Sequence, residues 1–180
     1  MKKQHGFTLI ELVVVIVILG ILAVIAAPKF MNLQNDARTA TLKEMEGVLE
    51  STVDTVYEKM AANGMASVPY VVNEKIPPEG AIYNSLSFMG CKDGVAVCSF
   101  QYGYPSAFAP TLNLLIDGVG KNSGIINDDF IAVQDNGLLK ITLATNAYKK
   151  GDRVFLRENK CYVSYEINGE ERPIIKFVAC

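Results

Sequence analysis

Few side chains in this sequence could do chemistry near neutral pH. The only histidine is His5, and the four cysteines, Cys91, Cys98, Cys161 and Cys180, all lie in the C-terminal half. None of the cysteines has the C-x-x-C spacing of a metal or redox site, and no nucleophile–base set or phosphate loop accompanies them. The residues therefore predict no enzyme, no metal and no cofactor. Two disulfides in an oxidising compartment are the simple interpretation, and four free thiols in a cytosolic protein are the alternative.

One acidic residue stands out, because Glu11 is the single charge in the apolar run 7–27. At about 1.5 Å per residue this run is roughly 30 Å long, enough to cross a bilayer as a helix. Lys2 and Lys3 before it should stay on the cytoplasmic side. A cleaved signal peptide is one alternative, with Val24 and Ala26 near its cut. A plain anchor is another, but it does not explain an acid that costs at least about 2.5 kcal/mol near the bilayer centre.

The element that positions Glu11 must be a long helix. Beyond Ala27 the apolar residues recur at threes and fours, which is typical of an amphipathic helix packed on a domain. Its predicted stripe is Phe30, Leu33, Ala37, Ala40, Met45, Val48, Leu49, Val53, Val56, Tyr57 and Met60. Pro28 should kink this helix and Gly20 weaken it, and Asn63-Gly64 should end it.

Residues 6–11, after a short basic leader, resemble the signature of type IV prepilins and of type II secretion pseudopilins: Gly6-Phe7-Thr8-Leu9-Ile10-Glu11. The resemblance implies that a prepilin peptidase cuts between Gly6 and Phe7 and methylates the amino group of Phe7. It also implies that the stretch from Gly20 to Pro28 loses helical structure on assembly. Tyr102-Gly103-Tyr104-Pro105 and the C-terminal cysteine pair resemble the mannose-sensitive haemagglutinin (MSHA) class of pilins.

The expected fold is α+β, with the long helix packed on a C-terminal antiparallel sheet. The predicted organisation is a leader 1–6, a transmembrane and filament-core half-helix 7–28, and a globular domain 29–180. Within the domain we expect helix 29–62, a loop 63–94 and a sheet region 95–180. Strands are predicted at 95–102, 130–134, 138–144, 153–157, 161–167 and 174–179.

Strand register bears on the cysteine pairing. If 168–173 form the last hairpin loop, then Ile167 faces Ile174 and Cys161 faces Cys180. A tight turn at Asn168-Gly169 would instead leave Cys180 unmatched. A turn at 94–95 would set Cys91 opposite Cys98. Four cysteines allow three pairings, of which register favours Cys91 with Cys98 and Cys161 with Cys180.

Three further groups of residues carry weaker signals. Asp117, Asp128 and Asp129 flank a glycine-rich loop but match no calcium-binding spacing. Lys149, Lys150 and Arg153 form a compact basic cluster, of the kind that most often is simply exposed. Aromatic residues around Pro105 could contact a sugar, although aromatics beside a sheet are more often core.

These features together predict a structural protein. The expected function is the major subunit of an MSHA-like type IV pilus, a homo-oligomeric helical filament for surface attachment. The expected partners are the inner membrane before assembly, the prepilin peptidase and assembly machinery, and a surface carbohydrate as receptor. The chain should cross the inner membrane once and then reach the outside of a Gram-negative cell. Its net charge of -2 argues against nucleic acid. The alternatives are a secretion pseudopilin and a DNA-binding minor pilin.

Overall fold

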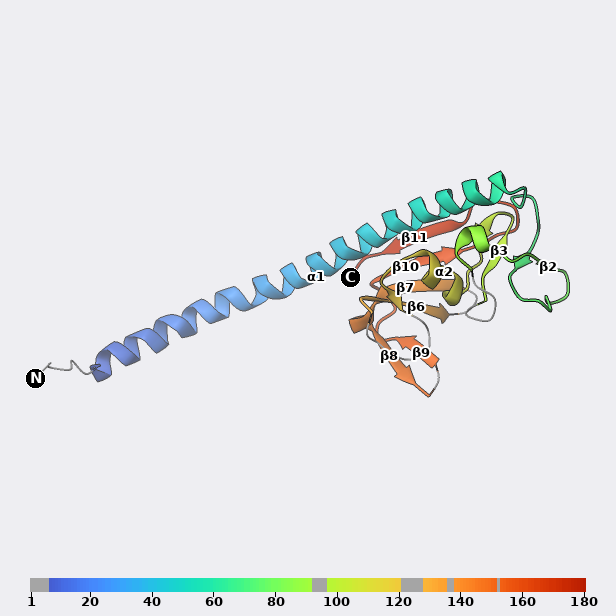
Figure 1. The fold of residues 1–180 in the computed structure, drawn as a ribbon. Coiled ribbons are helices and arrows are strands. Elements are labelled where there is room, and N and C mark those ends of the chain that lie inside the picture. The colour runs from blue at the N-terminus through green and yellow to red at the C-terminus, as the bar shows by residue number, and fades with distance from the viewer. Residues whose placement is uncertain (1–6, 92–96, 121–127, 136–137, 152) are drawn as a thin grey trace, which may run out of the picture. The chain divides into compact units, whose positions relative to one another are not determined.

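The computed structural model describes residues 7–91, 97–120, 128–135, 138–151 and 153–180, with the backbone alone at 31–32. The chain forms two compact units, one ending at Ala37 and the other running from Arg38 to Cys180. One long helix is followed by short, mostly antiparallel strands (Figure 1). The predicted α+β class is therefore confirmed.

The long helix, α1 (Leu9–Ala62), is continuous through Pro28. It ends at the predicted stop, where Gly64 takes the left-handed conformation with φ of 72°. The Gly64 N–H donates to the Ala61 carbonyl at 3.0 Å and the Met65 N–H to the Met60 carbonyl at 2.9 Å. This pair of bonds is a Schellman motif, which satisfies carbonyls that the helix end leaves free.

In the unit that begins at Arg38, α1 buries a single stripe of side chains. Its members are Leu42, Met45, Leu49, Val53, Val56 and Met60. Leu42 has the same helical spacing but was not predicted. Phe30 and Leu33, predicted for the stripe, are instead 69% and 64% exposed. Helical periodicity indicates which residues share a face, but it does not indicate which part of that face is buried.

The larger sheet contains five strands in the order β11 (Ile174–Val178), β10 (Tyr162–Glu166), β7 (Leu138–Leu143), β6 (Phe130–Asp135) and β5 (Val119–Gly120). All neighbouring strands are antiparallel except β5 and β6, which are parallel. The main core lies between this sheet and α1, where Leu139, Ile141 and Val163 pack against the buried stripe of the helix. The sheet therefore covers the amphipathic part of α1, as the layer argument predicts.

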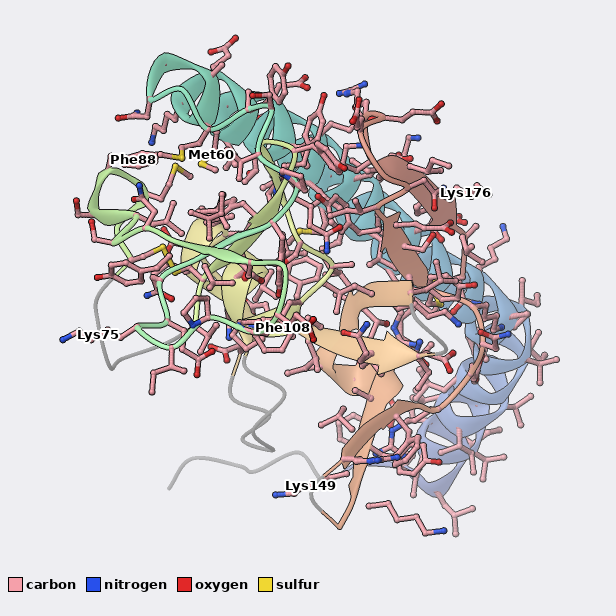
Figure 2. All side chains as sticks on the ribbon, turned by 90° about the vertical axis from the view of Figure 1, so that its right-hand side faces the viewer. Met60, Lys75, Phe88, Phe108, Lys149 and Lys176 are labelled. Carbon is pink, nitrogen blue, oxygen red and sulfur yellow. A yellow bond between two sulfur atoms is a disulfide. The ribbon has the colours of Figure 1, made fainter. Side chains whose placement is uncertain are left out.

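A smaller sheet has the order β2 (Ile82–Tyr83), β1 (Val71–Val72), β3 (Ser99–Gln101) and β4 (Tyr104–Pro105). Residues 63–94, expected as a loop, thus contribute two short strands and a 3-10 helix, Ser87–Met89. A second core lies here, and Figure 2 shows Met60 beside Phe88 within it. Helix α2 (Ala109–Leu115) was not predicted, although Pro110 in its first turn is a typical start signal.

A third, two-stranded sheet is the hairpin β8 (Ala147–Lys150) and β9 (Arg153–Leu156). Its Ala147 and Val154 pack on Ile131 and Val133 of β6. Ala132, between those two β6 residues, faces α1. Because side chains alternate across a strand, the hairpin lies on the sheet face that points away from α1, as Figure 1 shows.

The predicted register of the last hairpin is wrong by one residue. Glu166 pairs with Ile174, so the loop is 167–173 rather than 168–173. Cys161 lies just before β10 with φ of 59°, and its N–H donates to the Ala179 carbonyl at 3.2 Å. Its side chain therefore does not follow the strand alternation. The disulfides nevertheless join Cys161 to Cys180 and Cys91 to Cys98, the pairing that register favoured.

Candidate functional site

The first candidate site is the apolar N-terminal stretch of α1. Its side chains are exposed, with Phe7 at 84%, Leu9 at 80% and Val24 at 76%. By length and composition α1 is able to cross a membrane. Burying one Val, Leu or Ile side chain contributes about 1.5–3 kcal/mol, so a stretch of this kind requires a lipid or protein environment.

Thr8 and Glu11 form a capping box at the start of this helix. The Thr8 N–H and hydroxyl both donate to Glu11 Oε2, at 2.9 and 2.6 Å. The Glu11 N–H in turn faces Thr8 Oγ1 at 3.4 Å. Such reciprocal bonds satisfy backbone groups that a helix start leaves free. The role of Thr8 was not predicted, although the T-x-x-E spacing is a standard signal for it.

The cap leaves room for a further partner of Glu11. Both Thr8 bonds reach Oε2, and within the described residues Oε1 accepts no bond. Phe7, which the resemblance makes the new N-terminal residue, directly precedes the cap. Gly6, the other half of the expected cleavage site, lies outside the described residues. Phe7 and Thr8 thus directly precede the first turn of α1, which contains Glu11.

Gly20 and Pro28 lie inside the continuous helix. A methyl group added at Gly20 would meet nothing within 4 Å, so no contact in this chain requires glycine there. Pro28 lacks the N–H that would bond the carbonyl four residues earlier. The expected loss of helix between these two residues stays a prediction about the assembled state.

The disulfide Cys161–Cys180 ties the C-terminus to the start of β10. The Cys180 N–H donates to Thr39 Oγ1 at 3.4 Å, and Lys43 lies 5.3 Å from the ring of Phe177 on β11. The Thr142 hydroxyl donates to the Cys161 carbonyl at 2.6 Å. These contacts hold the C-terminal end of the chain against both α1 and the start of β10.

Aromatic residues near Pro105 are used mainly in packing. The Tyr104 ring stacks on Tyr57 with centroids 4.7 Å apart, and burial raises the pKa of Tyr104. Tyr165 is fully buried and its hydroxyl donates to the Pro105 carbonyl at 2.6 Å. Phe108 is 42% exposed. The structure therefore gives this region a structural role rather than an open aromatic surface.

The charged clusters of the sequence fall in separate places. Asp128 lies against Gly120, where an added methyl group would come within 2.3 Å of its carboxylate. Within the described ranges no group of three or more His, Cys, Asp or Glu side chains is placed to hold a metal ion. Lys149, Lys150 and Arg153 lie exposed on the β8–β9 hairpin, where Figure 2 shows Lys149 pointing outward.

Comparison with known proteins shows a match between residues 1–27 and the prokaryotic N-terminal methylation motif. The chain is 40% identical over 92 residues to fimbrial protein EcpB of Eikenella corrodens, which covers 50% of this chain and 52% of that protein. It is 48% identical over 49 residues to PilA5 of Thermus thermophilus, named as the major component of a type IV narrow pilus, which covers 27% of this chain and 42% of that protein.

The chain is also 48% identical over 42 residues to type II secretion system core protein G of Pseudomonas aeruginosa. This match covers 23% of this chain and 30% of that protein. The chain spans about half or less of the length of these curated relatives. No solved structure matches the chain. The N-terminal segment is thus similar to those of type IV pilus proteins and of a type II secretion core protein.

Proposed function

We propose that this chain, a type IV pilin by its N-terminal segment, is the major structural subunit of an MSHA-like type IV pilus. It resides first as a single-pass protein in the inner membrane of a Gram-negative cell. It then packs into a helical filament on the cell surface, which serves attachment. One observation carries the proposal. The chain combines two parts. One is an exposed apolar helix start that carries a single carboxylate, and the other is a disulfide-bonded unit with its own core.

The apolar side chains at the start of the helix must be buried against lipid or protein. Because Val, Leu and Ile side chains dominate it, leaving it in water would cost several times the burial energy of one side chain. Lipid covers it before assembly, and the same segment of neighbouring subunits covers it afterwards. The globular unit needs no such cover, since its stripe from Leu42 to Met60 is already buried. Assembly therefore buries the first part of the helix and leaves the sheets outside.

Processing supplies the charge that Glu11 requires. A cut after Gly6 by the prepilin peptidase creates an amino group on Phe7, which is then methylated and stays positive. In an apolar filament core an unpaired carboxylate is very costly. We infer that Glu11 of one subunit meets the Phe7 amine of its neighbour, which fixes the axial stagger between subunits. The Oε1 atom, which the cap does not use, is available for this contact.

A second candidate function is a type II secretion pseudopilin, favoured by the similarity to core protein G. A pseudopilin would share the helix start and the processing but would act in secretion rather than attachment. Deletion of the gene distinguishes the two. A pilus subunit predicts loss of surface filaments with normal secretion, and a pseudopilin predicts the reverse.

The test is N-terminal mass spectrometry of filaments sheared from cells, combined with imaging of those filaments. We expect the main subunit to begin at N-methylated Phe7 and to keep its apolar segment. A Gly6→Val variant serves as the control, because it should keep residues 1–6 and stay in the membrane fraction. A mature protein that begins at Ala27 would show an ordinary signal peptide and overturn the filament proposal.

A further inference from the structure

The β8–β9 hairpin exposes an aromatic pair that the core does not use. Tyr148 and Phe155 face each other across the hairpin, with ring centroids 5.7 Å apart and an angle of 29° between the rings. The two side chains are 37% and 38% exposed. The neighbouring Ala147 and Val154 point the other way and are buried. The hairpin thus leaves two stacked rings partly exposed to solvent.

Beside these rings lies a hollow of about 730 Å³ between the hairpin, the end of β6 and the segment that follows β9. Its polar lining includes Gln134, Asp135, Arg153, Arg157 and Asn159. A volume of this order is typical of small-molecule sites, which combine apolar walls with a few placed polar groups.

A buried cation fixes part of the polar lining. The Lys140 side chain is only 7% exposed, and its Nζ donates to Asp135 Oδ2 at 2.7 Å and to Asn159 Oδ1 at 3.0 Å. The same amine lies 4.6 Å from the centre of the Tyr162 ring. Because both lining groups are bound by one buried charge, their positions are set before any ligand arrives. Lys140 also offsets the negative charge of Asp135.

The other side of the hollow is cationic. Lys150 and Arg153 are paired across the hairpin on the same face as the two rings. Arg157 donates from Nε to the Ala147 carbonyl at 3.1 Å, and its guanidinium lies 6.0 Å from the Tyr148 ring. These positive groups lie close together, although the net charge of the whole chain is -2. The hollow is therefore a local positive site on an acidic protein.

We propose that this hollow binds a saccharide that carries a carboxylate, as a uronic acid does. The aromatic pair offers flat apolar faces to the C–H face of a pyranose ring. Asp135, Asn159 and Gln134 supply acceptors and donors for ring hydroxyls. Arg153 presents a planar fork that matches a carboxylate in a bidentate contact. The inference concerns the globular unit alone, so it holds whether or not the chain assembles into filaments.

Single-stranded nucleic acid is the competing ligand, since it also uses rings and positive charge. A continuous basic groove would be required to follow several phosphates. Here the carboxylate of Asp135 lines the hollow together with Arg153 and Arg157, so the basic groups do not form a continuous groove. A compact ligand with one acidic group and several hydroxyls suits this arrangement better.

The experiment uses the full chain in a non-ionic detergent and measures binding by calorimetry. The probes are an oligogalacturonate, its methyl ester and an oligothymidylate of similar length. We expect the oligogalacturonate to bind at least tenfold more tightly than its methyl ester, which has the same sugar rings without the charge. Tighter binding of the oligothymidylate, or equal binding of acid and ester, overturns the proposal.

Variants locate the site. Arg153→Gln and Tyr148→Ala change exposed side chains and should each weaken oligogalacturonate binding about tenfold or more, equal to about 1.4 kcal/mol. Lys149→Gln is the matched control, because it removes one charge from the opposite face of the same hairpin and should change binding less than threefold. Unfolding midpoints of all three variants show that the fold is kept. If Lys149→Gln weakens binding as much as Arg153→Gln does, the ligand responds to the positive charge of the hairpin in general, and the proposed site in the hollow is wrong.

Discussion

Glu11 combines two roles in one carboxylate. Within its own chain it accepts the Thr8 N–H and hydroxyl through Oε2 and so caps the helix. In the proposed filament it also neutralises an amino group of a neighbour. A capping bond contributes about 1 kcal/mol, whereas an unpaired charge in an apolar core costs several times as much. We therefore expect the charge to matter more to assembly than the cap.

Substitutions at the two residues separate these roles. Glu11→Gln keeps a side chain suited to the capping box but removes the charge, and Thr8→Ala removes the cap but keeps the charge. We expect both Glu11→Gln and Glu11→Ala to be cut after Gly6 and to accumulate in the membrane without normal filaments. Thr8→Ala should retain most filaments. Filament counts by electron microscopy check this, and wild-type numbers of pili in Glu11→Ala cells would refute charge pairing.

A second prediction at this scale concerns Tyr165, whose pKa is raised by burial. An unfolded tyrosine ionises near pH 10, so the folded chain holds this proton to higher pH than the unfolded chain. The stabilisation is complete below about pH 10 and is lost above it, by up to about 1.4 kcal/mol per pH unit. Tyr165→Phe should reduce this alkaline loss. It should also cost about 1–2 kcal/mol at neutral pH, since the Pro105 carbonyl loses its donor.

Urea unfolding of the full chain in detergent at pH 8 and pH 10.5 measures both effects. Tyr83→Phe, which changes an exposed tyrosine, should behave as the wild type does. An equal alkaline loss in Tyr165→Phe and wild type would exclude Tyr165 as its source. Part of the loss should remain in Tyr165→Phe, because burial also raises the pKa of Tyr104.

Among the elements, the part of α1 from Gly20 to Pro28 is expected to lose helical structure on assembly. Substitution of Gly20 tests this expectation. Alanine is about 1 kcal/mol more favourable than glycine inside a helix, and the added methyl at Gly20 meets nothing within 4 Å. Gly20→Ala should therefore hold the stretch helical and reduce the number of filaments. Gly47→Ala is the matched control, since an added methyl there also meets nothing within 4 Å.

Both variants are scored by filament counts at equal amounts of pilin in the membrane. Gly47→Ala should assemble as the wild type does. Equal, normal assembly of the two variants would show that the stretch does not need to lose its helix. Equal, reduced assembly would show that helix strengthening anywhere is harmful, which would also refute a special role for Gly20.

A disulfide bridge joins the start of β10 to the C-terminus. Cys161 and Cys180 are separated by 19 positions. On the chain-entropy account, closing a loop of this size stabilises the fold by roughly 3 kcal/mol. Replacing both cysteines by serine should lower the free energy of unfolding by about that amount and leave less pilin at the surface. A change below about 0.5 kcal/mol in denaturant unfolding would contradict it.

At the scale of the whole molecule, the core depends on α1 only from Leu42 onward. A chain that begins at Lys29, exported behind a conventional signal peptide, keeps the whole buried stripe. It should be monomeric without detergent and contain both disulfides. A chain that begins at Glu50 loses Leu42, Met45 and Leu49, and each large buried side chain contributes about 2–5 kcal/mol. We expect that chain not to fold.

Size-exclusion chromatography, thermal unfolding and thiol titration of the two truncated chains check this prediction. Aggregation of the Lys29 chain would mean that the globular unit needs the first part of the helix for its stability. A cooperative unfolding transition in the Glu50 chain would mean that the sheets form a core without these three side chains.

Features that depend on near neighbours in the chain could be predicted from the amino-acid sequence alone. The apolar run, the lone Glu11 and the helix stop at Asn63-Gly64 follow from spacing and backbone preference. Five of the predicted strands coincide with β6, β7, β9, β10 and β11. Even the Thr8–Glu11 cap, which was overlooked, is visible as a local T-x-x-E signal. Each of these follows from contacts between residues a few positions apart.

Features that depend on partners distant in sequence could not be predicted before the folded structure was known. Two-residue strands such as β1 and β5 exist because a neighbouring strand bonds them, and their own side chains carry little signal. The register of β10 and β11 shifted by one residue because a loop of seven residues is as feasible as one of six. The hollow beside the hairpin likewise depends on residues distant in sequence, since Lys140 binds both Asp135 and Asn159. Such pairings are chosen by packing energies summed over the whole unit, which no local pattern contains.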